Sequence, residues 1–247
     1  ILSNNHVLAN SNVANAGDAI LQPGPTDGGN NPADRVAELA RFVPLRYIGD
    51  TSDNPQPRPD PVDPGEPPGC NVVGLFVAIT NFIAGLTGSS ERVVTAPFSA
   101  TASNAGTPVM PAPVAVASTR AQGADNLVDA ALARPLDPDM FKDEILEIGQ
   151  INGTKSPTLG MQVRKHGRTT RLTDGTVNLL NATVSVAYGD RTARFTGQVI
   201  ATAMSQGGDS GSVIVDPADN RAVGLLFAGS PLATIFTPID MVSAALD

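Results

Sequence analysis

The second half of the chain is a series of short runs in which apolar and polar positions are interleaved, and turn residues separate the runs. Such runs predict strands, here at residues 159–165, 175–180, 182–188, 191–202, 213–215, 222–227 and 234–237. The dipeptide Gly189-Asp190 between two of these runs predicts a tight hairpin turn. A short C-terminal helix is predicted from the spacing of Ile239, Val242 and Leu246.

The first half shows a weaker pattern. Residues 1–9 read as the end of a strand that carries His6 into a loop, and residues 10–31 are rich in the turn formers Asn, Gly, Asp and Pro. Pro32 suits the first turn of a helix. Apolar residues then follow at helical spacing, namely Val36, Leu39, Phe42 and Val43. We therefore expect a surface loop followed by a short helix.

Prolines recur through residues 53–69, which favours exposed polyproline II structure in a loop or flap. The longest apolar stretch, residues 72–86, is shorter than the roughly 20 residues that a membrane span needs. We expect a buried strand or helix there instead. Residues 109–118 predict an irregular or edge strand, because two prolines interrupt the run.

Composition narrows the function classes. The 247 residues include 24 glycines and 21 prolines, with 4% aromatic residues and no tryptophan, which favours short strands joined by turns. A formal net charge of −8 argues against a nucleic-acid partner. A single cysteine, Cys70, excludes an internal disulfide, as in cytoplasmic proteins and in many secreted bacterial proteins. No signal peptide is recognisable, so the compartment stays open.

The strongest chemical signal is the hexapeptide Gly-Gly-Asp-Ser-Gly-Ser at residues 207–212. A serine nucleophile needs a histidine base, and the base needs a carboxylate that holds its tautomer. The two histidines, His6 and His166, both precede Ser210. The α/β-hydrolase order, in which histidine comes last, is therefore excluded, and Ser212 stands where that motif has glycine.

Two chain orders remain. The order Asp, His, Ser can be built from Asp125 or Asp129 with His166, but the residues around His166 and Ser210 do not resemble subtilisins. The order His, Asp, Ser needs a carboxylate after His6 in an apolar segment where it can be buried. Asp129 lies in such a segment, Val-Asp-Ala-Ala-Leu-Ala, whereas the neighbours of Asp125 predict a loop.

Five segments, taken in chain order, resemble the chymotrypsin-fold serine proteases, particularly their disulfide-free bacterial members. They are the histidine motif, the acid motif, the serine motif, the strand that lines the cleft and the strand before the C-terminal helix, at residues 3–7, 129–132, 208–211, 223–230 and 234–239. The segment Lys-His-Gly-Arg-Thr-Thr at residues 165–170 also resembles a bacterial trypsin-like subset.

The resemblance implies an all-β fold of two antiparallel six-stranded β-barrels with a short C-terminal helix. Residues 1–138 would form the first barrel with long loop insertions, residues 139–158 the connection, and residues 159–247 the second barrel. In the family the histidine lies on the third strand, so the first barrel would be incomplete in this chain. We expect a missing upstream segment, or a partner segment, to complete it.

By the same resemblance Ser210 would be the nucleophile, His6 its base and Asp129 the acid that orients His6. The N–H groups of Gly208 and Ser210 would form the oxyanion hole. The substrate pocket would be apolar and shallow, lined by Met204, Phe227, Ala228, Gly229 and Thr234. Such a pocket favours small or medium apolar side chains. No metal-ligand or cofactor-binding motif is recognisable, so no cofactor is expected.

The predicted activity is that of a serine endopeptidase acting on polypeptides. Two alternatives stay open: a catalytically silent module that holds peptides in the same cleft, and a protease domain within a larger regulated protein of defence or signalling. Ile1 is not expected to act as the new N-terminus of an activated zymogen. It lies too close to His6 to reach Asp209 while that histidine stays in place.

Overall fold

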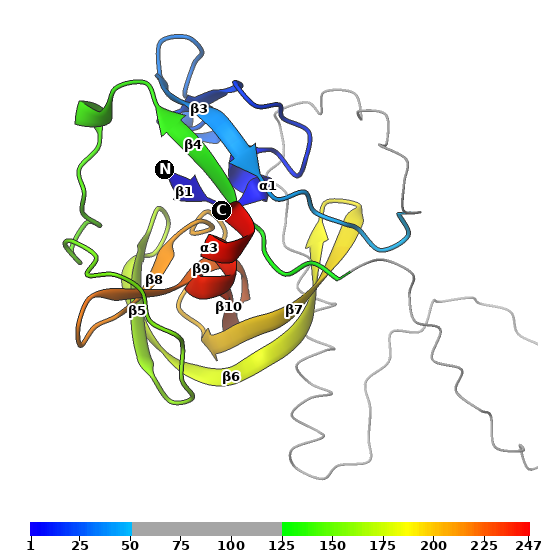
Figure 1. Ribbon diagram of the computed structural model, residues 1–247, viewed down its shortest axis with the longest axis vertical. Helices are drawn as coiled ribbons and strands as arrows, with labels where there is room; N and C mark the ends of the chain where they lie inside the picture. The colour runs from blue at the N-terminus through cyan, green and yellow to red at the C-terminus, as the bar shows by residue number, and fades with distance from the viewer. Residues whose placement is uncertain (51–124) are drawn as a thin grey trace, which may run out of the picture.

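The computed structural model describes residues 1–50 and 125–247, and these residues form two antiparallel β-structures (Figure 1). The first is a four-stranded sheet and the second is a closed barrel, so the predicted all-β class is confirmed. The predictions for residues 53–69, 72–86 and 109–118 and for Cys70 lie outside the described residues. No helix in the described ranges is long and apolar enough to cross a membrane.

The barrel closes in the strand order β10-β7-β6-β5-β8-β9. Its strands are β5 (Gln162–Gly167), β6 (Arg171–Tyr188), β7 (Arg191–Thr202), β8 (Val213–Asp216), β9 (Arg221–Ser230) and β10 (Ala233–Pro238). The strands predicted in the second half are all present, with shifts at their ends. The hairpin turn is confirmed as well, because Tyr188 pairs with Arg191 across it. The predicted domain boundaries stay a prediction.

Strand β6 runs unbroken where the sequence predicted two strands. Asn181 takes a left-handed conformation (φ 55°), and the pairing of β6 with β7 shifts register on both sides of it. Such irregularities bend and twist a strand without ending it. The bend lets β6 curve around one side of the barrel, as the yellow-green ribbon of Figure 1 shows. The prediction of two separate strands was therefore wrong.

The first sheet has the strand order β1-β4-β3-β2. It consists of β1 (Leu2–Ser3), β2 (Ala19–Leu21), β3 (Arg35–Phe42) and β4 (Ala131–Pro135), and the short helix α1 (Asn5–Leu8) follows β1. His6 thus lies in α1 rather than in a loop. The segment predicted as loop between residues 10 and 31 includes β2 and a 3-10 turn, Pro25–Asp27. In the described part of the chain this sheet has fewer strands than a six-stranded barrel.

The helix predicted to start at Pro32 is wrong, because these residues form β3. Ala37 and Leu39 are both buried, which is the alternation of a strand rather than the spacing of a helix. β3 pairs with β2 on one side and with β4 on the other. Pairing with two neighbours satisfies the backbone hydrogen bonds, so tertiary contacts override the helical spacing in the sequence.

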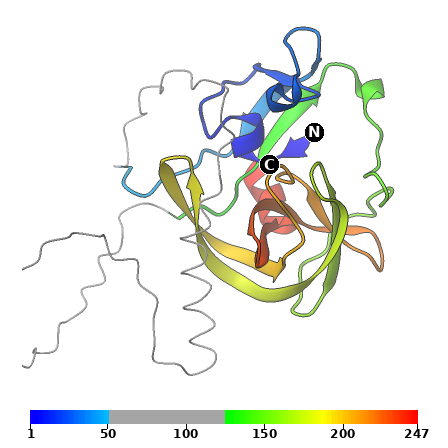
Figure 2. The same ribbon diagram turned by 180° about the vertical axis from the view of Figure 1, so that it is seen from behind.

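The predicted C-terminal helix is confirmed as α3 (Ile239–Leu246), and Figures 1 and 2 show it between the first sheet and the barrel. Its apolar face belongs to a cluster that draws on both halves: Val128, Ala130, Ala222, Leu225, Ile239, Val242 and Leu246. Because Val128 and Ala130 flank Asp129, this packing holds the backbone on both sides of that aspartate.

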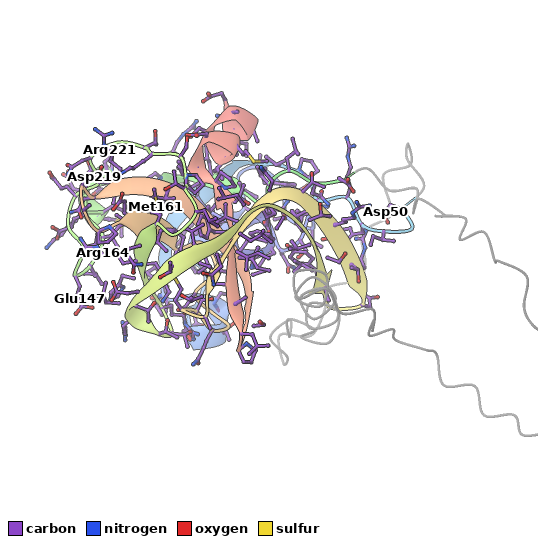
Figure 3. All side chains as sticks on the ribbon, turned by 90° about the horizontal axis from the view of Figure 1, so that it is seen from below. Asp50, Glu147, Met161, Arg164, Asp219 and Arg221 are labelled. Atoms are coloured by element: carbon purple, nitrogen blue, oxygen red, sulfur yellow. The ribbon has the colours of Figure 1, made fainter. Side chains whose placement is uncertain are left out.

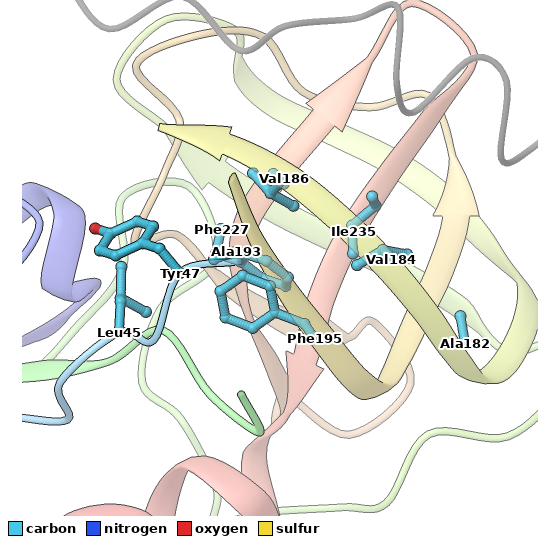
Figure 4. Close-up of a cluster of buried hydrophobic side chains, with 10 residues drawn as sticks. Leu45, Tyr47, Ala182, Val184, Val186, Ala193, Phe195, Phe227 and Ile235 are labelled. Carbon is cyan, nitrogen blue, oxygen red and sulfur yellow. The ribbon is translucent and has the colours of Figure 1, made fainter. Parts of the chain in front are cut away.

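A second cluster of ten buried side chains fills part of the barrel (Figure 4). Phe195 on β7 and Phe227 on β9 pack against each other in it, with ring centroids 4.8 Å apart. Leu45 and Tyr47 join it from the segment after β3. The first half of the chain therefore contributes to the core of the second.

The charged side chains labelled in Figure 3 lie on two opposite sides of the part that the structure describes. Seen from below, Asp50 lies beside the β6–β7 end, and the far end carries Glu147, Arg164, Asp219 and Arg221 (Figure 3). Arg191 donates two hydrogen bonds to Asp50, at 3.0 and 2.9 Å, and its guanidinium lies 3.6 Å from the centre of the Tyr47 ring. These contacts hold the β6–β7 hairpin against the segment that follows β3.

Phe195→Ala should lower the free energy of unfolding by about 3–5 kcal/mol, because it removes a fully buried aromatic ring and leaves a cavity. Urea titration measures this change. Phe141→Ala is the matched control, since Phe141 is 39% exposed, and it should change stability by about 0.5 kcal/mol or less. Equal losses in the two variants would contradict the assignment of Phe195 to the core.

Candidate active site

His6 and Asp129 form a hydrogen-bonded pair. Nδ1 of His6 lies 2.6 Å from Oδ2 of Asp129, and the backbone N–H of His6 donates to Oδ1 at 3.2 Å. Asp129 is fully buried, whereas the His6 side chain is 15% exposed. A carboxylate at Nδ1 favours the tautomer with its proton on that nitrogen, which leaves Nε2 as the acceptor. The imidazole is therefore oriented to take a proton at Nε2.

The local sequence Ser-Asn-Asn-His anchors this pair. Asn4, fully buried just before α1, donates from Nδ2 to the backbone oxygen of Asp129 at 2.8 Å. Asn5, also buried, donates from Nδ2 to the backbone oxygen of Val43 at 2.7 Å. The two amides tie the helix that carries His6 to the segments beside it, and one of those segments carries the acid.

A tyrosine that was not predicted from the sequence completes the surroundings of the carboxylate. The hydroxyl of Tyr188 donates to Oδ2 of Asp129 at 2.8 Å, and its ring centroid lies 5.5 Å from that of His6. Tyr188 is the last residue of β6, 59 positions from the acid in the chain. No motif or spacing marks it, so only the fold brings it to this place.

The competing residues lie elsewhere. The side chain of Asp125 is 36% exposed, and its carboxylate lies 3.4 Å from Nε of Arg194. Nε2 of His166 lies 3.1 Å from the carboxylate of Glu147. The structure thus brings His6 together with Asp129 and places both Asp125 and His166 with other partners.

The loop that carries Ser210 packs against β1. Gly211 has a positive φ of 87°, and a Cβ atom at this position would collide with the side chain of Ser3. The N–H of Gly211 also donates to the backbone oxygen of Leu226 on β9, at 2.8 Å. Because Ser3 precedes His6 by three residues, the serine loop and the histidine segment are close neighbours. In the described structure Ser210 and His6 are not hydrogen bonded to each other.

Gly208 in the same loop also has a conformation that favours glycine. Its φ is 95°, and a Cβ there would lie 2.5 Å from Oγ1 of Thr169 and 2.8 Å from the guanidinium of Arg168. Arg168 in turn donates from Nε to the carboxylate of Asp27, in the first half, at 2.7 Å. Within the described ranges the N–H groups of Gly208 and Ser210 donate to no acceptor.

The aspartate that precedes the serine is buried in a hydrogen-bond network. The carboxylate of Asp209 accepts from the hydroxyl and the N–H of Thr170 and from the N–H groups of Gln206 and Thr169, over 2.6–3.1 Å. Burial alone would raise the pKa of Asp209, but these hydrogen bonds outweigh it and hold the pKa below its usual range. Asp209 therefore stays ionised while its side chain is shielded from water.

Lys165 supplies the opposite charge. Its Nζ lies 3.4 Å from Oδ2 of Asp209, and both side chains are fully buried. Nζ also donates to the hydroxyl of Thr170 and to the backbone oxygen of Arg171. Burial lowers the pKa of Lys165, and the carboxylate of Asp209 opposes that shift. The segment at residues 165–170 thus holds the base of the serine loop in place.

The predicted pocket residues lie on and beside the barrel strands. The side chains of three of them pack in the barrel core: Met204, Phe227 and Ala228. The buried hydroxyl of Thr234 accepts from the N–H of Met204 at 2.9 Å and lies 2.8 Å from the hydroxyl of Ser205. Ser205, which was not predicted, is half-buried, and a Cβ at Gly229 would lie only 2.7 Å from its Oγ. Ser205, Gly229 and Thr234 are therefore in contact.

These residues provide a hydroxyl, an imidazole and a carboxylate, with two backbone N–H groups on the loop that bears the hydroxyl. A set of this kind supports attack by a serine on a carbonyl carbon, with the imidazole as the base. No group of three or more potential metal ligands occurs within residues 1–50 and 125–247.

No protein-family model and no curated protein matches the chain. Among solved structures, the chain is similar to a glutamic acid-specific serine protease at 26% identity (TM-score 0.38), to Cellulomonas bogoriensis chymotrypsin at 25% (0.38) and to Thermobifida fusca protease A at 24% (0.40). Each match covers 48% of this chain. The chain covers 65%, 66% and 65% of these three structures, just under two thirds of their length.

Lys165→Met should lower the free energy of unfolding by about 3 kcal/mol, because it leaves the buried Asp209 without its cation. Urea titration measures the loss. Lys142→Met, at a side chain that is 85% exposed, is the control and should have almost no effect. The double variant Lys165→Met/Asp209→Asn should lose less than the sum of the single variants. Additive losses would show that the two side chains are not coupled.

Proposed function

We propose that this protein is a serine endopeptidase in which Ser210 is the nucleophile, His6 its base and Asp129 the acid. One observation carries the proposal: the buried Asp129 is hydrogen bonded to Nδ1 of His6 at 2.6 Å, and the loop that bears Ser210 packs against the same segment. A carboxylate at Nδ1 orients the imidazole and stabilises the imidazolium that forms when the serine proton is taken.

In the proposed mechanism Oγ of Ser210 attacks the scissile carbonyl carbon while Nε2 of His6 takes the hydroxyl proton. The negative charge that develops on the carbonyl oxygen is stabilised by the N–H groups of Gly208 and Ser210. The C–N bond then breaks as His6 returns the proton to the leaving amine, and an acyl group stays on Ser210. A water molecule attacks this ester by the same route and restores the free serine.

The serine loop is suited to this task because it is held on two sides. The buried pair of Lys165 and Asp209 supports it from β5, and the close contact of Gly211 with Ser3 holds it to the first sheet. Donors that are fixed before the reaction need no reorganisation during it, which is the main source of oxyanion stabilisation.

For specificity, we infer a preference for small or medium apolar side chains at the position before the scissile bond. The residues assigned to the pocket carry no charge: Met204, Phe227, Ala228, Gly229 and Thr234. The neighbouring Ser205 adds only a hydroxyl that already bonds to Thr234. An uncharged pocket offers no partner for a buried Lys or Arg side chain.

Wild-type protein should react with a fluorophosphonate probe, and Ser210→Ala should abolish the labelling. Mass spectrometry of the labelled peptide identifies the modified residue. Ser212→Ala is the matched control from the same loop, and it should keep the labelling because its hydroxyl donates to the backbone oxygen of Asp209. If wild-type protein with correct folding binds peptides but never reacts, the silent binding module is the right description.

A library of peptides that differ before the scissile bond should give the highest kcat/KM with Ala, Val or Leu at that position. A hydrophobic pocket separates side chains that differ by one methylene by roughly tenfold or more, so the optimum should be visible as a ranking. Strong cleavage after Lys or Arg would overturn the assignment of the pocket.

A further inference from the structure

The carboxylate of Asp129 has a second side-chain donor besides His6. The hydroxyl of Tyr188 donates to Oδ2 at 2.8 Å, and Nδ1 of His6 lies 2.6 Å from the same oxygen. The other oxygen, Oδ1, accepts the backbone N–H of His6. One oxygen of the proposed catalytic acid is therefore shared between the proposed base and a tyrosine from the other half of the molecule.

This donor matters because the carboxylate is fully buried. A carboxylate that is removed from water is unfavourable unless hydrogen bonds replace its hydration. Among the described residues, His6 is the one basic side chain within 4 Å of Asp129, and it gains its charge during the proposed reaction. Tyr188 provides a neutral hydrogen-bond donor to Asp129 at every stage of the proposed reaction, and it adds no permanent charge.

The phenol ring is held in a rigid setting. Its centroid lies 6.0 Å from that of Tyr47 in an edge-on arrangement, 6.3 Å from Phe195 and 5.5 Å from His6. Packed aromatic rings of this kind lose their rotamer freedom on folding. The hydroxyl is thus fixed in position before a substrate binds.

Tyr188 also links the two halves of the chain at the site. Asp129 lies two residues before β4 of the first sheet, and Tyr188 ends β6 of the barrel. The hairpin that carries Tyr188 is held by Arg191, which pairs with Asp50 and stacks on the ring of Tyr47. The position of this hairpin therefore determines whether the second donor reaches the acid.

We propose that Tyr188 is a positioning residue for the catalytic pair: its hydroxyl fixes Oδ2 of Asp129 in the orientation that holds Nδ1 of His6. This inference rests on the proposed function, because it assigns Tyr188 a role in the same triad. Removal of the hydroxyl takes away one of the hydrogen bonds that fix the carboxylate of Asp129 and leaves more negative charge on the oxygen that faces His6. The imidazole is then less well oriented.

The charged and titratable groups around the pair are few in the part of the chain that the structure describes. His6 and Tyr188 touch the carboxylate, and Tyr47 lies behind Tyr188. Burial raises the pKa of Tyr47, so it stays neutral in the working range of the assay. Arg191 and Asp50 lie beyond Tyr47 and compensate each other.

The chain contains two tyrosines, which gives a matched pair of variants. Tyr188→Phe removes the hydroxyl that donates to Asp129, and Tyr47→Phe removes a hydroxyl that donates to the backbone oxygen of Ser11 instead. We expect roughly a tenfold loss in kcat for Tyr188→Phe with KM nearly unchanged, the effect of one hydrogen bond to a charged group. Tyr47→Phe should stay within about twofold of wild type.

The pH profile of kcat/KM separates positioning from a general loss of structure. In Tyr188→Phe the profile should differ from that of wild type, because the variant lacks the hydroxyl that contacts the carboxylate holding His6. Tyr47→Phe should keep the wild-type profile. If the two variants match each other in kcat and in pH profile, at equal thermal stability, the proposal is wrong.

An NMR measurement that does not depend on catalysis distinguishes a failure of the proposed function from a failure of the role proposed for Tyr188. In protein with ¹⁵N-labelled histidine, the proton between Nδ1 of His6 and Asp129 should give a low-field resonance, and a His166→Gln variant assigns it. Tyr188→Phe should shift or broaden this resonance, and Tyr47→Phe should not. Absence of hydrolysis in wild type would refute the proposed function alone, whereas an unchanged resonance in Tyr188→Phe would refute the role of Tyr188.

Discussion

The full burial of the Asp129 carboxylate is the constraint on which the candidate site depends. Its two oxygens obtain their hydrogen bonds from α1, through His6, and from β6, through Tyr188. Its backbone is held by Asn4 and by the apolar packing of its two neighbours against α3. Elements from both halves must dock before the carboxylate of Asp129 obtains all its hydrogen bonds. The site therefore forms together with the tertiary structure and cannot form within either half alone.

A second buried carboxylate, Asp209, meets the same constraint in another way. It has a permanent cation, Lys165, and four hydrogen bonds from short chain segments, so its charge is compensated locally. Asp129 has a histidine in place of a lysine, and it also accepts a hydrogen bond from the neutral hydroxyl of Tyr188. The two buried acids thus differ in their partners: a lysine in the β5 strand balances the charge of Asp209, whereas an imidazole and a phenol satisfy the oxygens of Asp129.

The sequence predictions succeeded where local chemistry dominates and failed where packing overrides it. The alternating runs of the second half, the turn at Gly189 and the apolar face of α3 were confirmed, because each depends on near neighbours in the chain. The helical spacing after Pro32 was misleading, since β2 and β4 pair with that segment on both sides. The break expected near Asn181 is a bend within one strand, which becomes visible only when the barrel closes.

The sequence by itself determined the order of His6, Asp129 and Ser210, because chain order and residue type need no coordinates. That order excluded the α/β-hydrolase fold, in which the histidine comes last. The sequence also favoured Asp129 over Asp125 through the apolar context. The tertiary structure decided the contacts: the hydrogen bond between His6 and Asp129, and the donation from Tyr188. Tyr188 lies 59 residues from its acceptor and belongs to no motif, so its role depends on how a barrel hairpin meets the first sheet. Contacts between distant segments are set by packing, and packing leaves no local pattern in the sequence.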